Sequence, residues 1–240
     1  MPNKCAFCPG SAKITGEHVW SAWINELFPI ASVTFRRIQA GGSEGKPWTA
    51  PQLNLKTRVV CETCNNTWMS DIENNYAKPA MCDMILGKRL GTISKKRAHG
   101  LSLFAFKTAV VANRSLPESE FFFDQSDRFA FRESFSIPRD VGMWLVGVEP
   151  FAGGTISSYN VRFPNLSLNV CTFSIGQLGF QTVAAKSPSP VQIESLPTPP
   201  GLTLSFYPPT ELHVRWPGPK VLGIQVLNDF TFRWATIRRV

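Results

Sequence analysis

The sequence predicts an α+β fold, in which a small cysteine-stapled N-terminal module is followed by a helix and a mainly antiparallel β C-terminal domain. Three observations support this expectation. Two Cys-x-x-Cys pairs lie in the first part of the chain, apolar side chains recur at helical spacing after each pair, and short apolar or alternating runs fill the second half. Helical spacing indicates amphipathic helices, whereas short alternating runs are typical of strands.

Composition describes a folded globular protein with excess positive charge. Of 240 residues, 43% are hydrophobic and 18% are charged, which excludes wholesale disorder. The chain has no apolar run of about 18 residues, and its N-terminus runs directly into a cysteine pair. We therefore expect no membrane anchor and no secretory signal, and a cytoplasmic location. The 25 lysines and arginines exceed the 17 acidic residues, giving a formal charge of +8 that favours polyanionic partners.

Basic residues are concentrated between Met84 and Pro117, a stretch without any acidic residue. A solvated loop would account for such a run. Beside a phosphodiester site, however, the same residues would hold substrate phosphates through counterion release. The candidates for nucleic-acid binding are Lys88, Arg89, Lys95, Lys96 and Arg97, with Lys107 and Arg114 further along the chain.

The cysteines predict a structural zinc site. Four of the six cysteines form two pairs of identical spacing, namely Cys5 with Cys8 and Cys61 with Cys64. A tight turn between two such cysteines points both sulfurs at one ion, at about 2.3 Å. Disulfides or a redox dithiol are the alternatives, but an intracellular setting disfavours disulfides, and two matching pairs favour one tetrahedral Zn²⁺. Cys82 and Cys171 are left over and are expected to be small buried hydrophobes.

An acidic-His pair lies between the two cysteine pairs, and an asparagine follows the second. Glu17-His18 stands in ITGEHVW, and Asn65 comes directly after Cys64 in CETCNN. This order resembles the zinc-containing HNH, or ββα-metal, endonucleases, whose pattern is Cys-x-x-Cys, Asp-His or Glu-His, then Cys-x-x-Cys-Asn. The resemblance covers residues 5–80. It implies a β-hairpin that carries the acidic-His pair and a following helix that carries the asparagine.

The resemblance also implies roles for these residues. Glu17 and Asn65 would bind one catalytic divalent cation, and His18 would be the general base that activates water. Hard oxygen ligands suit Mg²⁺ or Mn²⁺, and an unperturbed histidine pKa of about 6.5 suits proton transfer near neutral pH. The expected reaction is hydrolysis of nucleic acid, with DNA favoured over RNA, to leave a 5′-phosphate and a 3′-hydroxyl.

The sequence departs from the family pattern in three places, and each residue has an alternative explanation. No proline follows His18 closely, Lys56 stands where many members have an asparagine (Asn54 is shifted by two), and Trp68 or Met69 replaces an auxiliary ligand. Glu73, one turn beyond Met69 on the same helical face, is a candidate auxiliary ligand, or else a surface glutamate. His18 could be a core histidine, Glu17 could begin a helix, and Asn65 could be a helix N-cap, with Asn66 as ligand instead.

The patterns place the following elements along the chain. Residues 19–28 predict a short helix, 33–38 a strand, 41–48 a loop, and the stretch from Asn65 to Pro79 the helix of the ββα unit. Residues 100–113 predict another helix, in which Lys107 is the only residue with a charged side chain. Strands are expected at Arg128 to Phe135, Met143 to Val148, Leu166 to Phe173, Leu202 to Tyr207, Leu212 to Trp216, Val221 to Leu227 and Phe230 to Ile237.

The strand pattern favours an antiparallel sandwich or barrel in the C-terminal half. The expected division is a zinc-stapled nuclease module at 1–83, a basic linker and helix at 84–118, and a β-rich domain of unknown role at 119–240. His213 has no cysteine or acidic partner at ligand spacing and is expected to be structural or exposed. This half could recognise nucleic acid, bind a regulatory ligand or partner, or stabilise the nuclease.

The functional hypothesis is thus an HNH-type endonuclease with structural Zn²⁺ and catalytic Mg²⁺ or Mn²⁺. Two rivals remain. A zinc-knuckle protein that grips nucleic acid without cutting it would tolerate the loss of His18. A defence or toxin-like effector nuclease, gated by a partner or small molecule acting on the β-rich half, would be active only when that partner is present.

Overall fold

The N-terminal part of the computed structural model contains a strand pair built from segments far apart in the chain. The structure describes residues 4–10, 12–28, 33–35, 46–195, 203–209, 211–218, 221–223 and 235–239. Strand β1 (Ile14–His18) pairs antiparallel with β4 (Lys56–Cys61), so that Ile14 faces Cys61 and His18 faces Lys56. The register shifts between Thr15 and Glu17, and such irregularities re-aim the side chains beside them.

The segment between β1 and β4 is only partly as expected. The predicted helix over 19–28 shortens to α1 (Ile24–Leu27). Strand β2 (Val33–Phe35) confirms the first half of the strand predicted over 33–38 and pairs with β3 (Trp48–Ala50). Most of the loop expected at 41–48 lies outside the described residues.

A bent helical segment follows β4 directly. It comprises α2 (Glu62–Cys64), the wide turns η1 (Asn65–Met69) and η2 (Ile72–Ala77), and α3 (Lys78–Ile85), with non-helical dihedral angles at Thr67. The predicted helix is therefore present, but the predicted stop at Pro79 is wrong. Pro79 lies at the start of α3, directly after the wide turn η2.

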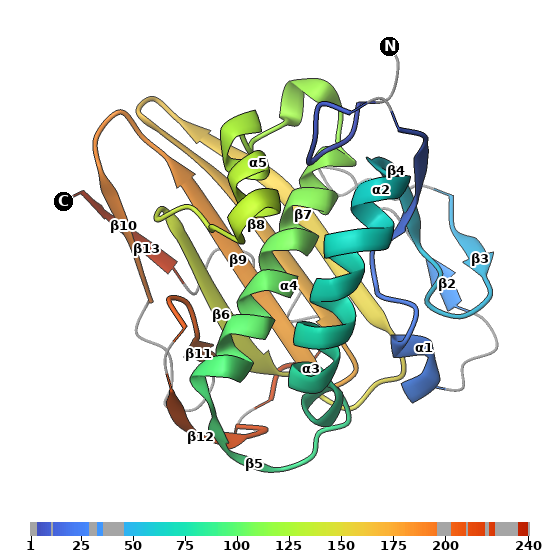
Figure 1. Cartoon of the computed structure of the whole chain (residues 1–240). Coiled ribbons are helices and arrows are strands. Elements are labelled where there is room, and N and C mark those ends of the chain that lie inside the picture. The colour runs from blue at the N-terminus through green and yellow to red at the C-terminus, as the bar shows by residue number, and fades with distance from the viewer. Residues whose placement is uncertain are drawn as a thin grey trace.

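Helix α4 (Lys95–Arg114) runs through the middle of the molecule (Figure 1). It begins earlier than the predicted 100–113 because the Ser94 hydroxyl caps it and accepts a hydrogen bond from the Arg97 backbone N–H at 3.2 Å. At Gly100 it approaches η2 very closely, since a Cβ there would lie 2.5 Å from the backbone oxygen of Tyr76. No helix in the described ranges is long and apolar enough to cross a membrane.

The C-terminal half is built on one antiparallel sheet, with strand order β11-β6-β9-β8-β7. Its strands are β6 (Val141–Gly147), β7 (Gly154–Phe163), β8 (Leu166–Ile175), β9 (Leu178–Lys186) and β11 (Thr203–Ser205). The mainly antiparallel β region is confirmed, but the described strands form an open sheet and not the expected sandwich or barrel. Helix α4 covers one face of it (Figure 1) and contacts β7, β8 and β9.

The prediction of a strand at Arg128 to Phe135 is wrong, because this segment is helix α5 (Gln125–Ser134). Arg128 and Phe131, three residues apart, are buried on one side of it, and Phe135 ends it in a left-handed conformation with φ of 54°. The remaining described elements are η3 (Glu118–Glu120), β5 (Leu90–Ile93), β10 (Val191–Ser195), β12 (Leu212–Trp216) and β13 (Ala235–Arg239).

These outer strands form two pairs, β5 with β12 and β10 with β13. The strand predicted at Leu212 to Trp216 is confirmed. Those predicted at Val221 to Leu227 and Phe230 to Ile237 fall mostly outside the described residues.

A single buried cluster joins the cysteine pairs to the sheet. It includes Cys5 and Cys61, Phe104 of α4, and Phe173 and Phe180 of the sheet. All three predicted regions therefore contribute side chains to one core, and the boundaries at 83 and 118 stay predictions.

Candidate functional site

The two cysteine pairs converge on one point. The sulfurs of Cys5, Cys8, Cys61 and Cys64 all lie within 4.8 Å of one another, and those of Cys8 and Cys61 are 3.6 Å apart. Four ligands about 2.3 Å from one Zn²⁺ in a tetrahedron would have sulfurs about 3.8 Å apart. β4 ends at Cys61 and the helical segment begins after it, so the second pair lies at the strand-to-helix junction. The tetrad can therefore hold a metal ion, as expected for zinc.

The surroundings of Cys5 suit a thiolate. The backbone N–H groups of Phe7 and Cys61 each donate to its sulfur at 3.4 Å. The hydrogen bond from the Cys64 thiol, together with these N–H groups, lowers the pKa of Cys5 to about 4. Since zinc binds the deprotonated sulfur, these donors fit a metal-bound tetrad.

Helix α5 supports the first cysteine pair from the other side of the core. The Arg128 guanidinium donates to the backbone oxygen of Ala6, inside the pair, and to that of Phe123 at 3.2 Å. The Phe131 ring lies 6.4 Å from that of Phe7 and 5.7 Å from that of Trp68. The tetrad is thus anchored to the C-terminal part by a buried cation and an aromatic cluster.

Glu17 lies in a buried group of three charges. Glu17 is only 2% exposed, and its Oε1 lies 2.9 Å from the Nζ of Lys107 in α4. The same Nζ lies 2.5 Å from Oε1 of Glu73 in η2. Strand β1, the bent helix and α4 thus each contribute one member to what we call the ion triad, Glu17, Glu73 and Lys107.

The triad holds its lysine charged. Burial opposes the charge on Lys107, but attraction by Glu17 and Glu73 outweighs it and raises the Lys107 pKa above its usual value. Burial also raises the pKa of Glu17, and the Lys107 ammonium works against that rise. Two carboxylates share one ammonium, so the ionised triad carries a net charge of −1.

His18 lies next to the triad and is half-buried. Burial and then the nearby Lys56 ammonium lower its pKa, so its neutral form is favoured near neutral pH. The Glu73 carboxylate, and then hydrogen bonding by the Asn54 side chain, work against this lowering of the His18 pKa. A neutral imidazole can accept a proton, which the role of general base requires.

Asn65 lies beside β1, in contact with Thr15. Its Nδ2 donates to the Thr15 hydroxyl at 3.3 Å, which leaves Oδ1, the metal-binding type of atom, out of that bond. The alternative of an N-cap is not met, because the helix begins at Glu62, with Cys61 at the N-cap position. Asn66 is exposed.

The predicted nucleic-acid-binding residues lie away from His18. Lys95 and Lys96 begin α4, about 17 Å along the helix axis from Lys107 at 1.5 Å per residue. Lys88 forms an ion pair with Asp83 at 3.0 Å, and Arg97 lies 3.9 Å from the same side chain. The basic groups nearer to His18 are Lys56, its partner across the strand pair, and Arg58 two residues on, both exposed.

Two of the residues around His18 were not placed at this site from the sequence. Asn54 was noted only as a shifted asparagine, and Lys107 only as a basic residue of the stretch between Met84 and Pro117 and as the polar residue of an apolar helix. A lysine in the otherwise mostly apolar run over residues 100–113 was the one available signal in the sequence, since lysines are almost never fully buried without a partner.

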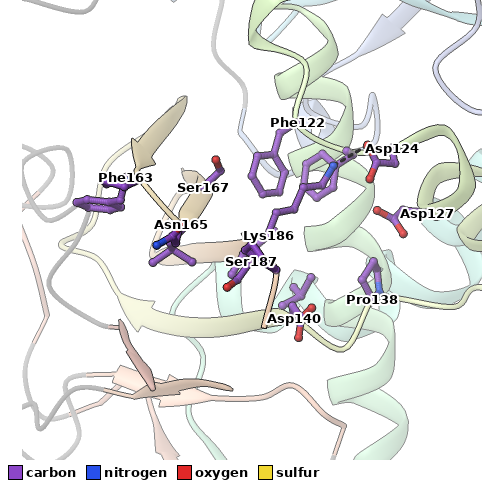
Figure 2. A pocket seen from close by; sticks show the side chains of 17 residues that line it. Phe122, Asp124, Asp127, Pro138, Asp140, Phe163, Asn165, Ser167, Lys186 and Ser187 are labelled. Carbon is purple, nitrogen blue, oxygen red and sulfur yellow. Dashed lines mark ion pairs between the residues drawn. The ribbon is translucent and has the colours of Figure 1, made fainter. Parts of the chain in front are cut away.

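A separate cleft of about 570 Å³ opens in the C-terminal part (Figure 2). None of the predicted site residues lines it. Three carboxylates face it, from Asp124, Asp127 and Asp140, and Lys186 pairs with Asp124 at 2.7 Å beside the Phe122 ring. This acidic lining suits no phosphate backbone, so the cleft does not extend the candidate nuclease site.

The two remaining cysteines do not belong to the tetrad. Cys171 is buried in β8 and Cys82 is half-buried in α3, and burial raises the pKa of both. His213 is exposed, as the sequence predicted, and its Nε2 lies 3.6 Å from Glu211, an acidic neighbour that was not expected from the sequence.

Protein-family models, curated proteins and solved structures were all compared with this chain, and none of them matches it.

Proposed function

We propose that this chain is a metal-dependent endonuclease of the HNH type that hydrolyses phosphodiester bonds in nucleic acid, with DNA favoured. The observation that carries the proposal is the assembly of the ordered motif around one strand pair. The cysteine tetrad joins the start of the chain to the end of β4, while Glu17 and His18 stand on β1 and Asn65 begins the following helical turns. Zinc-knuckle packing alone does not require this acidic-His-Asn set.

The donor atoms fit a divalent cation. A carboxylate offers about four acceptor positions, and Lys107 contacts Oε1 of Glu17. Asn65 donates through its nitrogen and keeps its oxygen for a cation. The net charge of −1 on the ion triad also favours one divalent ion. Glu17 and Asn65 would hold this ion, which would stabilise charge on the phosphate and on the leaving oxygen.

His18 would take the proton from the attacking water. Its lowered pKa favours the neutral ring, which can accept that proton. Lys56, directly across the strand pair and exposed, would hold a substrate phosphate beside the imidazole. The expected products are a 5′-phosphate and a 3′-hydroxyl.

The test compares wild-type protein with His18→Ala and His213→Ala on supercoiled plasmid and structured RNA, with Mg²⁺ or Mn²⁺. His213 is the matched control, because it is a histidine exposed on β12. We expect His18→Ala to lower cleavage by about 10²- to 10⁴-fold, the usual contribution of a positioned base, with zinc content unchanged. His213→Ala should cut at the wild-type rate.

Two other outcomes would contradict the proposal. Equal cleavage by His18→Ala would place the chemistry elsewhere. Nucleic-acid binding without cleavage, unaffected by His18→Ala, would favour the zinc-knuckle binding protein. Cleavage that needs an added partner would instead favour a gated effector that uses the same site.

A further inference from the structure

Three charged side chains from three separate elements meet below the surface. The Lys107 side chain is 1% exposed, that of Glu17 is 3% exposed and that of Glu73 is 18% exposed. Lys107 projects from α4, the helix between the bent helical segment and the sheet (Figure 1). Its neighbours along the helix, Phe106 and Thr108, are both buried. A fully buried lysine in such a helix requires an explanation.

Fold stability is a poor explanation for this ion triad. Charges removed from water lose their hydration, so buried ion pairs often stabilise a fold no more than apolar residues of similar volume would. Position is more informative. Glu17 is the residue before His18, and both Glu73 and Lys107 act electrostatically on that histidine. The triad therefore lies at the candidate site and not in an unrelated part of the core.

We propose that Lys107 is a positioning residue of this site: its ammonium fixes the Glu17 carboxylate through Oε1, so that Oε2 is directed to the divalent cation. The inference rests on the proposed function. Glu73, which the sequence suggested as an auxiliary ligand, instead anchors Lys107 from the opposite side. Two of the three ammonium protons are then used by the two carboxylates.

The surrounding backbone can hold this arrangement in place. Lys107 lies in the middle of a helix of 20 residues. The close approach of Gly100 to Tyr76 fixes the distance between α4 and η2 seven residues earlier on α4. Glu17 sits at the irregular register of β1, which sets its direction. Groups that orient a metal ligand in this way affect metal affinity without touching the ion.

The experiment measures Mn²⁺ affinity by electron paramagnetic resonance on the full, zinc-loaded chain. Wild type should bind one Mn²⁺ that is lost in Glu17→Gln. Lys107→Met should bind it about 10- to 100-fold more weakly, the usual effect of removing a partner that orients a ligand. Lys78→Met is the matched control, since Lys78 pairs with the exposed Glu26 on the same module and its loss removes the same charge.

A merely structural role would leave the affinity of correctly folded protein unchanged, so zinc content and melting temperature are measured on each sample. Should Lys107→Met fail to fold, Glu73→Gln decides, because it keeps the lysine and removes its anchor, while Glu26→Gln, at an exposed carboxylate of the same module, controls for the lost negative charge. That variant should bind Mn²⁺ more weakly than wild type does. Unchanged affinity in the folded variant would overturn the inference, and tighter binding would show that Lys107 competes with the metal instead.

Failure of this inference is distinct from failure of the proposed function. If wild type binds Mn²⁺ at Glu17 and cleaves nucleic acid, but the Lys107 and Glu73 variants bind Mn²⁺ as tightly, only the positioning role is lost. If wild type neither binds Mn²⁺ nor cleaves, the proposed function is wrong and the positioning role falls with it.

Discussion

Removal of zinc should unfold the C-terminal sheet as well as the N-terminal module. All four cysteines of the tetrad are buried, with Cys61 and Cys64 at 0% exposure. Zinc held by four such ligands contributes about 10–16 kcal/mol at neutral pH. The whole stability of a domain is only about 5–15 kcal/mol. Loss of the ion therefore removes as much free energy of folding as the chain is expected to have.

The structure indicates that this loss spreads. Arg128 and Phe131 dock α5 on the first cysteine pair, and a single buried cluster continues from there through Phe104 to Phe180 of the sheet. The assay is far-UV circular dichroism of the strands during treatment with a strong zinc chelator, with zinc release followed by a dye. We expect both signals to change together, and Cys64→Ser to be insoluble or unfolded.

Cys82→Ser is the control, because Cys82 is half-buried and lies outside the tetrad. It should keep its zinc and its strand signal. If the chelator removes zinc while the sheet keeps its circular dichroism and its melting temperature, the shared-core reasoning is refuted. The N-terminal module would then be an independent unit joined to a self-sufficient sheet.

Three further predictions concern thiols, packing and substrate contacts. Burial raises the pKa of Cys82, and it raises the pKa of Cys171 to about 12. Because the thiolate is the reactive form, iodoacetamide should label zinc-loaded protein slowly at Cys82, faster as pH rises, and at Cys171 only after unfolding. Early labelling of Cys171 would contradict its burial. Phe131→Ala should lower the free energy of unfolding in guanidinium chloride by about 3–5 kcal/mol through the cavity it leaves, while Phe163→Ala, at a side chain 52% exposed, should change it by less than about 0.5 kcal/mol. Lys56→Ala with Arg58→Ala should reduce the salt dependence of nucleic-acid binding by about two units of slope, and Lys95→Ala with Lys96→Ala should reduce it less; the reverse order would place the bound phosphates away from His18.

The cysteine tetrad could be predicted from sequence because its information is local. Each Cys-x-x-Cys pair specifies a tight turn, and zinc chemistry supplies the long-range pairing. The helix after Cys64 was likewise readable from apolar spacing. The sheet was partly readable: β6 and β8 carry apolar runs, whereas the edge strand β7 contains Thr155, Ser157 and Ser158 among its residues and gives no such signal.

Two failures have clear physical reasons. In α5, the alternation of Phe129 and Phe131 imitates a strand, while the helical pair Arg128 and Phe131 determines burial. The meeting of Lys107 with Glu17 and Glu73 could not be deduced, because it depends on how α4 packs against β1 and η2. Sequence spacing gave no information on that packing, and only the unusual lysine marked the place.

Gly100 illustrates how a residue without a functional group can determine the dimensions of a site. Alanine is the better helix former by about 1 kcal/mol, so intrinsic propensity favours alanine at this position. Yet its methyl group would meet the Tyr76 carbonyl oxygen at 2.5 Å. Gly100 and Lys107 are separated by close to two helical turns and share one side of α4. A methyl group at Gly100 would push α4 away from η2 and draw the Lys107 ammonium away from Glu73. Which residues are tolerated at position 100 should therefore depend on the geometry of the ion triad and not on helix propensity.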